Sequence, residues 1–359
     1  MFENISVITY IKRMPPSLPD IHADGYMGAV TWKDLTIVFE MEGNIFYHKD
    51  GKWHLKLTSG EIPKHRDGAG IAVHNDTVYM ICGETNFWEE HLYQNLYNDI
   101  HALDLNSWKW TKLTPTGLQP KKSSYMSAWI HNGKVYCFGG RLLDVGQAQT
   151  CSNQLFCYNI SSNSWELPST RGKSPSPRSQ HTTFISGDTA FLFGGKEAHG
   201  LKNDLFTLDM VTMTWTEVHP QLEHLGELVP ERRELHSMTL ISSEAAILLG
   251  GYGRTDCWLL DTAKVLRGDF AGPPSIWKRQ KKTIIGRADH YAVIEPVSKR
   301  LWILGSYPNS IASMTFNSGA SLKFLAMEKA LSFLSPGHPM LEASELPRHL
   351  KLEIENHFH

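Results

Sequence analysis

An apolar run that ends in a pair of glycines recurs along the chain, and this repeat limits the possible folds more than any other feature. Three complete copies end at Gly139-Gly140, Gly194-Gly195 and Gly250-Gly251. Two weaker copies keep one glycine each, in Cys82-Gly83 and Gly305-Ser306. The second positions fall at 83, 140, 195, 251 and 306, so successive copies are 57, 55, 56 and 55 residues apart. A period of this size, filled with short strands, predicts the blades of a β-propeller.

Each repeat carries three further landmarks, which together predict four strands per blade. A strand with a central histidine precedes the glycine pair, and an alternating strand and a lone tryptophan follow it. Period-two alternation lets a blade bury one face against the next blade. The glycines permit sharp turns and close approach to the neighbouring blade, and the tryptophans are expected to cover apolar area between blades. These landmarks are His181, His236 and His290, and Trp110, Trp165, Trp215 and Trp277.

The two ends of the repeat region are less regular than its centre. The first unit contains Trp53 but has lost its glycine pair, and counting it gives six units. The last unit has no tryptophan strand after Phe316. The β-branched segment 5–11 is therefore expected to supply the outermost strand of the last blade, because pairing of the two chain ends protects strand edges. The sequence thus predicts an all-β, six-bladed propeller over residues 1–317 and a short C-terminal helical tail over residues 318–359.

The tail is predicted from a change of periodicity after residue 317. Leu322, Leu325, Ala326 and Ala330 share one face at helical spacing, and Ser321 is a suitable N-cap. A second segment begins with Leu346 and Pro347 and continues through Leu350 and Ile354, with the proline placed to suit a first helical turn. A helical hairpin packed on the propeller would account for both segments without any partner.

Charge and cysteine content exclude several classes of function. The net charge is −2 and the pI is about 6.8, whereas general nucleic-acid binders and binders of anionic membranes need a strong basic excess. No apolar run approaches the length of a membrane span, and the N-terminus lacks the order of a signal peptide. The five cysteines form no Cys-x-x-Cys pair, and Cys82, Cys137, Cys157 and Cys257 lie in apolar runs. We expect reduced thiols, no metal or cofactor, and a cytoplasmic or nuclear setting.

Candidate binding residues lie in loops at one rim of the central channel, because the repeats themselves are blade packing. Arg141, Lys196 and Arg254 follow the glycine pair in three consecutive blades, where they could form a positive site for a carboxylate. A second set of loops precedes the histidine strand, and Asp24, Asp67 and Asp289 could make part of this rim acidic. The candidates in the second set are Tyr125, Ser179, Gln180, Glu234 and Leu235.

The recurring glycine pair, Asn-Asp element and tryptophan resemble the kelch pattern over roughly residues 20 to 310. With the tail, the chain resembles the kelch-domain-containing 1/2/3 group, which are substrate receptors of cullin-2 RING ubiquitin ligases and bind substrate C-termini in the propeller. The resemblance implies elongin B/C and cullin-2 as partners, with no nucleic acid and no membrane. It assigns elongin binding to Leu322, Ala326 and Ala330, and cullin binding to Leu346, Pro347 and Leu350.

The pocket departs from that group at several positions. Lys196 and Leu201 stand where that group has two arginines. Glu234 and Leu235 stand where it has a Ser-Trp pair. Tyr125 and Ser152 stand where it has a lysine and a tryptophan from the third blade. The chain is therefore expected to bind a changed C-terminal degron, or to bind it weakly. Two other classes remain open: a cytoskeletal or trafficking scaffold, and an enzyme. The sequence offers no Gly-rich phosphate loop, Gly-x-Ser-x-Gly or His-Glu-x-x-His motif, and we expect no catalytic activity.

Overall fold

The computed structural model describes residues 5–11, 26–40, 43–85, 95–143, 149–219, 229–269, 275–280, 288–295, 299–307 and 310–318. The chain divides into two compact units, Thr9–Thr315 and a unit made of Met1–Ile8 with Phe316–His359. The predicted helices of the tail lie outside the described residues. Within the described part, no helix is both long and apolar enough to cross a membrane.

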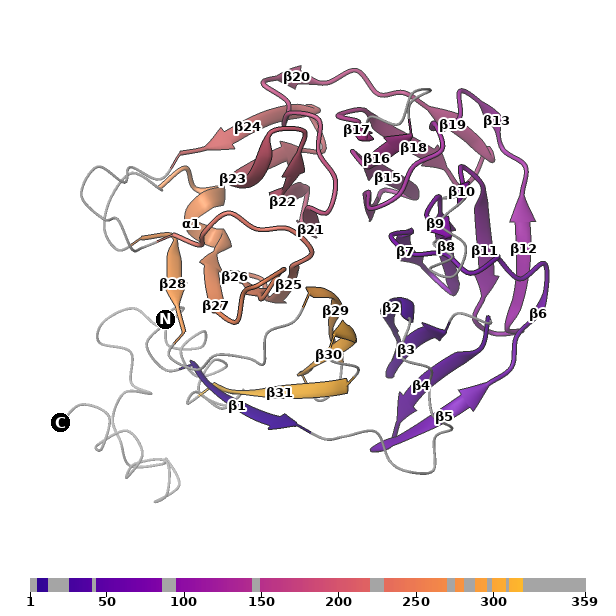
Figure 1. Cartoon of the computed structure of the whole chain (residues 1–359), viewed down its shortest axis with the longest axis horizontal. Coiled ribbons are helices and arrows are strands. Elements are labelled where there is room, and N and C mark those ends of the chain that lie inside the picture. The colour runs from indigo at the N-terminus through magenta and orange to yellow at the C-terminus, as the bar shows by residue number, and fades with distance from the viewer. Residues whose placement is uncertain are drawn as a thin grey trace, which may run out of the picture. The chain divides into compact units, whose positions relative to one another are not determined.

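The described residues of the larger unit form an all-β propeller, in which four strands of each blade pair antiparallel (Figure 1). Three of the blades add a short fifth strand that pairs in parallel at the outer edge. The blade nearest the N-terminus has the order β2-β3-β4-β5, with bounds Tyr26–Trp32, Leu35–Glu40, Ile45–Lys49 and Lys52–Lys56. The next has the order β6-β12-β11-β8-β7, with bounds Ser59–Gly60, Lys109–Leu113, Ile100–Asp104, Thr77–Ile81 and Gly70–His74. The third has the order β13-β19-β18-β15-β14, with bounds Thr116–Gly117, Ser164–Glu166, Leu155–Asn159, Lys134–Phe138 and Ser127–His131.

Two further blades follow in the same pattern. The fourth has the order β20-β24-β23-β22-β21, with bounds Arg171–Gly172, Thr214–Val218, Gly200–Asp209, Thr189–Glu197 and Thr182–Ser186. The fifth has the order β25-β26-β27-β28, with bounds Ser237–Ser242, Ala245–Leu249, Cys257–Asp261 and Trp277–Arg279. A five-residue helix that the sequence did not predict, α1 at Thr262–Leu266, follows β27 and is capped by the side chain of Asp261.

The last sheet contains strands from both ends of the chain, in the order β1-β31-β30-β29. Their bounds are Ile5–Ile11, Ser310–Ser318, Arg300–Tyr307 and Ala288–Ile294. Two short hairpins extend from the blades, β9 with β10 (Glu84–Thr85 and Asn95–Leu96) and β16 with β17 (Arg141–Leu143 and Gln149–Cys151).

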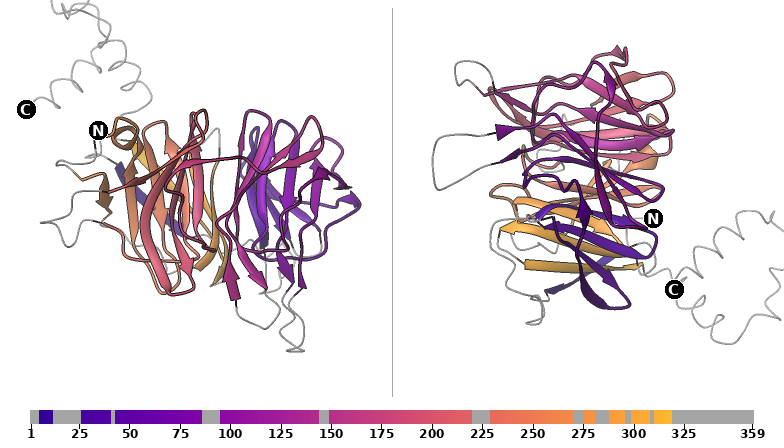
Figure 2. Two further views of the ribbon diagram at one scale, coloured as in Figure 1. Left: turned by 90° about the horizontal axis from the view of Figure 1, so that it is seen from above. Right: turned by 90° about the vertical axis from the view of Figure 1, so that its right-hand side faces the viewer.

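The innermost strands of neighbouring blades contact one another around the axis. In order these are β2, β7, β14, β21 and β25, and β29 of the last sheet contacts both β25 and β2. Figure 1 shows the blades around this axis, and Figure 2 shows them from two sides. Each blade therefore presents its inner strand and the loops next to it to the centre of the propeller.

The predicted tryptophans lie between blades, which confirms their packing role. Trp215 of the fourth blade packs on Phe138 of the third, with ring centroids 5.2 Å apart. Trp277 of the fifth blade packs on Phe193 of the fourth at 5.1 Å. Both tryptophans are buried, and aromatic rings bury large apolar areas, so these contacts hold the blades together. Cys82, Cys137, Cys157 and Cys257 are buried in the same layers as free thiols.

The glycine pairs bring the loops of adjacent blades into close contact. Gly139 has a φ of +73°, and a Cβ at this position would lie 2.6 Å from the carbonyl oxygen of Arg178 in the next blade. In the second blade, where the first glycine is missing, Cys82 takes the same left-handed conformation at a φ of +58°. The repeat thus conserves a backbone shape, and glycine is the residue that adopts this shape without steric cost.

Candidate functional site

A cavity of about 230 Å³ opens at the centre of the propeller, lined by residues of the innermost strands and of the loops that precede them. Five of the lining residues occupy the same place in the repeat. Each directly precedes the histidine of its repeat, or the residue that stands in place of that histidine. All five have left-handed backbone conformations, with φ between +52° and +59°. They are Gly68, Tyr125, Gln180, Leu235 and Asp289.

A chain of backbone hydrogen bonds links these positions from blade to blade. The amide of Tyr125 donates to the carbonyl of Gly68 at 2.7 Å, and the amide of Gln180 donates to Tyr125 at 3.0 Å. The amide of Leu235 donates to Gln180 at 3.2 Å, and that of Asp289 donates to Leu235 at 3.0 Å. An extended β conformation at these positions would break this series of hydrogen bonds. The bonds therefore account for the left-handed backbone at residues other than glycine.

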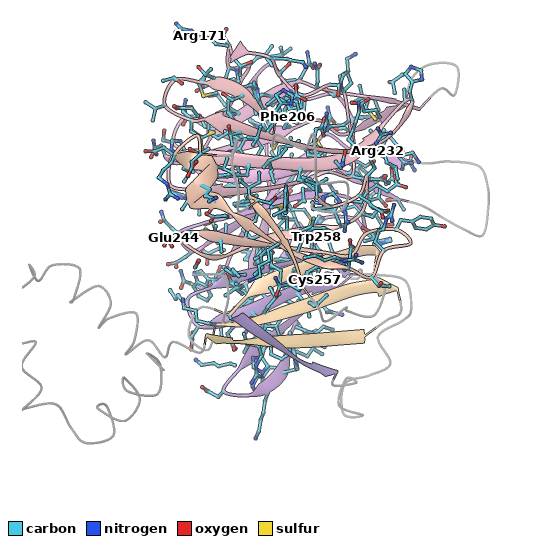
Figure 3. The ribbon with its side chains drawn as sticks, turned by 90° about the vertical axis from the view of Figure 1, so that its left-hand side faces the viewer. Arg171, Phe206, Arg232, Glu244, Cys257 and Trp258 are labelled. Carbon is cyan, nitrogen blue, oxygen red and sulfur yellow. The ribbon has the colours of Figure 1, made fainter. Side chains whose placement is uncertain are left out.

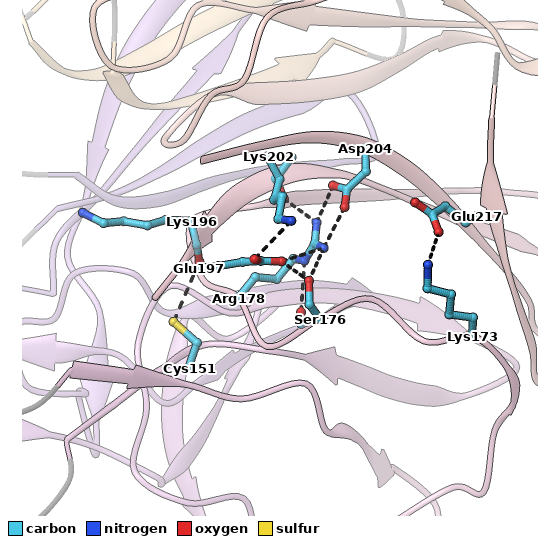
Figure 4. A network of polar contacts seen from close by, with 10 residues as sticks. Cys151, Lys173, Ser176, Arg178, Lys196, Glu197, Lys202, Asp204 and Glu217 are labelled. Atoms are coloured by element: carbon cyan, nitrogen blue, oxygen red, sulfur yellow. Dashed lines mark hydrogen bonds and ion pairs between the residues drawn. The ribbon is translucent and has the colours of Figure 1, made fainter. Parts of the chain in front are cut away.

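Buried arginines fix the loops that carry these positions. Arg178 is fully buried and donates to both carboxylate oxygens of Asp204, at 2.6 and 2.9 Å, and to the carbonyl of Gly194 at 2.9 Å (Figure 4). Arg66 with Asp99, and Arg233 with Asp256, make the same contacts in their blades. Bidentate pairs hold both partners in one geometry, so the loops begin from rigid anchors.

The third blade lacks both members of this pair. Ser123 stands at the arginine position and Gln154 at the aspartate position. Loss of only one partner would leave a buried charge without compensation, which is costly. The paired replacement therefore indicates that the arginine and aspartate act as one structural unit.

Arg141 binds a carboxylate of its own chain. Its guanidinium pairs with Glu84, whose side chain is 1% exposed, and Ser124 Oγ donates to the same carboxylate oxygen at 2.6 Å. The ring centroid of Tyr125 lies 5.5 Å from the guanidinium carbon. Arg141 therefore neutralises a buried acid of the neighbouring blade, and it does not line the cavity.

Lys196 and Arg254 also have acidic neighbours. Lys196 Nζ lies 3.7 Å from Glu234, and its side chain is directed away from the Arg178 network (Figure 4). Arg254 pairs with the exposed Glu231. Neither lines the cavity, and neither do Ser179 and Glu234. The positive site expected from Arg141, Lys196 and Arg254 is thus divided among three separate ion pairs, while Tyr125, Gln180 and Leu235 do line the cavity as candidates.

The acidic part of the rim is stronger than the sequence suggested. Burial, with the nearby charges of Asp67 and Glu84, raises the pKa of Asp289 to about 7. Burial and the same three carboxyl groups raise the pKa of Tyr125, so its phenol stays protonated. Asp67 and Asp289 were predicted as acidic rim residues, whereas nothing in the sequence marks Glu84, directly after Gly83, as a buried carboxylate.

Two histidines of the cavity wall, His181 and His236, are held in the neutral form. Burial and the charge of Arg178 lower the pKa of His181 to about 3, and its Nε2 lies 2.8 Å from Ser127 Oγ. His290 Nε2 makes the equivalent contact with Ser237 Oγ at 2.8 Å. Burial, with Arg233 and His290, places the pKa of His236 well below its ordinary value. The wall therefore offers His181 and His236 as neutral hydrogen-bonding groups.

Comparisons with known proteins agree with this architecture. Residues 36–266 match the model of the KLHDC2/KLHL20/DRC7 Kelch-repeats domain. The chain is 30% identical over 220 residues to acyl-CoA-binding domain-containing protein 4 of Arabidopsis thaliana, covering 58% of this chain and 30% of that protein. It is 25% identical over 230 residues to kelch domain-containing protein 2 of Bos taurus, covering 58% and 54%.

Two further comparisons extend this result. Kelch domain-containing protein 1 of Homo sapiens is 26% identical over 231 residues, covering 59% of this chain and 55% of that protein. The chain thus spans about half or less of the length of these curated relatives. The solved structure of YjhT has a TM-score of 0.59 at 17% identity, covering 83% of this chain and 96% of that one, and so shares the fold.

Proposed function

Because the chain belongs to the KLHDC2/KLHL20/DRC7 family of kelch-repeat domains, we propose that it is a non-catalytic substrate receptor of a cullin-2 RING ubiquitin ligase. In this proposal the propeller binds a substrate protein at the central cavity. The tail attaches the receptor to elongin B/C and cullin-2, in the cytoplasm or the nucleus. A kelch scaffold without a ligase role would share the propeller but would not need the two tail motifs.

The observation that carries the binding role is the variety of side chains at the five left-handed positions. All five backbones have nearly the same left-handed φ, yet the positions hold glycine, tyrosine, glutamine, leucine and aspartate. Structural positions of this repeat vary less: the buried arginine is Arg66, Arg178 and Arg233 in three blades, and the tryptophan is Trp110, Trp165, Trp215 and Trp277 in four. A fixed frame with varied side chains around a cavity is what specific recognition requires.

The sequence of residues 321–354 supports the ligase role. Leu322, Ala326 and Ala330 fit the elongin-binding box, and Leu346, Pro347 and Leu350 fit the cullin-2 box. The two boxes occur in the order that substrate receptors use, after a kelch propeller. These residues lie outside the described part of the chain, so the sequence pattern is their support.

We infer in addition that the sheet β1-β31-β30-β29 is the sixth blade. Its inner strand β29 contacts β25 on one side and β2 on the other. Asp289 belongs to β29, and its amide bonds to Leu235 of the fifth blade. A sixth blade at this place explains why Asp289 continues the series of cavity positions.

Affinity purification tests the ligase role. The full chain should recover elongin B, elongin C and cullin-2, whereas a variant with Leu322→Ala and Pro347→Ala should lose all three and keep its substrates. Recovery of the same set of partners by both proteins would refute the ligase role and favour a scaffold. Circular dichroism of both proteins should show equal β content, which verifies that the propeller is intact.

A further inference from the structure

The charges around the cavity are unbalanced toward acid. Asp289 lines the cavity, and it interacts electrostatically with Asp67 and Glu84. Of these three carboxylates, Glu84 is neutralised by Arg141. No lysine or arginine is found among the described residues that line the cavity. A ligand carboxylate would therefore be repelled there, while a ligand cation would gain favourable interactions in a partly desolvated site.

Buried acceptor groups of the cavity wall lack donors among the described residues. Nε2 of His236 has no hydrogen-bond partner although the residue is 6% exposed, and Oε1 of Gln180 is buried and equally unpartnered. His181 and His290 each contact a serine of the preceding blade, Ser127 and Ser237. The equivalent residue of the blade that precedes His236 is Thr182, and Nε2 of His236 has no such contact. Because His236 is neutral, one of its ring nitrogens is an acceptor. Buried polar groups without partners carry a free-energy cost that a donor on a ligand would remove.

From these features, we propose that the cavity binds the cationic side chain of a lysine or arginine in a partner polypeptide. This inference rests on the proposed binding role of the propeller. Asp289 supplies the counter-charge, and Gln180 and His236 accept hydrogen bonds from the cation. The cavity of about 230 Å³ is smaller than the roughly 300–1,000 Å³ of small-molecule sites, and it suits one inserted side chain.

Peptide libraries can test this preference on the full chain. Heptapeptides with acetylated and amidated ends would carry arginine, lysine, citrulline, norleucine or glutamate at the central position, with random flanks. A parallel library would end in free glycine carboxylate. We expect the arginine or lysine library to bind about tenfold more tightly than the citrulline and norleucine libraries. Equal or tighter binding of the glutamate or the free-carboxylate library would overturn the proposal.

Matched variants locate the effect. Asp289→Asn should abolish the preference for cationic peptides, and Gln180→Leu should weaken it several-fold. Glu244 and Arg232 lie at opposite edges of the molecule in Figure 3. The control variant Glu244→Gln also removes one negative charge, and it should leave peptide binding unchanged. If Asp289→Asn does not fold, Gln180→Leu decides, and unchanged binding by that variant contradicts the assignment.

The outcome is separable from that of the ligase proposal. Peptide binding is read on the purified receptor without elongins or cullin, so loss of the ligase partners does not affect it. Conversely, a receptor that recovers cullin-2 but shows no preference for cationic peptides keeps its ligase role and loses the cation assignment.

Discussion

His48 Nδ1 lies 2.9 Å from Glu295 Oε1, although 247 residues separate the two in the chain. His48 belongs to the blade nearest the N-terminus, and Glu295 follows β29 directly. The imidazole also packs on the rings of Trp53 and Trp302, with centroids 5.2 and 4.7 Å away. This buried polar contact therefore joins the first blade to the last sheet inside an aromatic layer.

The energy of this junction can be measured with a double-mutant cycle. Glu295→Ala should lower the free energy of unfolding by about 1–3 kcal/mol, because a buried partner is lost. His48→Phe keeps the ring contacts, and in its background Glu295→Ala should cost about 1 kcal/mol less. Urea unfolding followed by tryptophan fluorescence would give all four values. Additive losses would mean that the two side chains do not interact.

Arg141 is expected to act on stability through Glu84. Arg141→Met leaves a buried carboxylate without its cation, which should cost about 3–5 kcal/mol of unfolding free energy. Adding Glu84→Gln keeps the acceptor for Ser124, removes the unpaired charge and should restore much of the loss. Arg254→Met is the matched control, because its exposed pair with Glu231 should be worth about 1 kcal/mol or less. Thermal and urea unfolding would rank the four proteins, and equal losses for Arg141 and Arg254 would contradict the structural role.

The sequence predicted the blades well because their determinants are local and repeated. The glycine pairs, the histidine strands and the tryptophans each mark a fixed place in the repeat, and Trp215 and Trp277 lie between blades as expected. Cys82 shows the limit of residue identity, since it adopts the left-handed shape of the missing glycine. The short helix α1 was missed because five residues give too little periodicity to separate a helix from a loop.

The polarity of the site was harder to predict because it depends on pairings across blades. The loop positions of Arg141, Lys196 and Arg254 were readable from the repeat, but their partners were not. Glu84 precedes Arg141 by 57 residues, and nothing in the sequence marks it as the buried partner of that arginine. A lysine or arginine that is paired with an acid of its own chain looks the same in a sequence as an unpaired one. Only the unpaired side chain can offer its full charge to a ligand.

The glycine pair offers a controlled test of blade contact. Gly139 and Gly133 have similar positive φ values, +73° and +69°, so alanine carries the same conformational cost at both positions. A Cβ on Gly139 would lie 2.6 Å from Arg178 O, whereas one on Gly133 meets nothing within 4 Å. Gly133→Ala should cost about 1–2 kcal/mol, and Gly139→Ala should cost about 1–3 kcal/mol more because of the added clash. Equal melting temperatures for the two variants would show that the close contact between the blades leaves enough room for a Cβ at position 139.

Stability should also depend on pH through Asp289. Its pKa is about 7 in the folded protein and about 3.9 in an unfolded chain, so the folded state binds the proton more tightly. The stabilising contribution of the protonated carboxyl is thus complete below about pH 4, and it is lost as the pH rises through about 7. Asp67 and Glu84 face the same group, and Tyr125 and Tyr291 lie within reach of its charge.

The buried histidines titrate in the opposite sense, so the effect of Asp289 must be read as a difference. His181, with its pKa near 3, and His236 stabilise the fold at higher pH and weaken it as the pH falls below about 6.5. Asp289→Asn keeps these histidines and removes only the carboxyl. The gap in unfolding free energy between this variant and the natural chain should widen in favour of the variant between about pH 4 and pH 7, the range between the two Asp289 pKa values. Urea unfolding at several pH values measures the gap, with Glu244→Gln as a control that should follow the natural chain. A gap that stays constant across this range would mean that Asp289 does not titrate there.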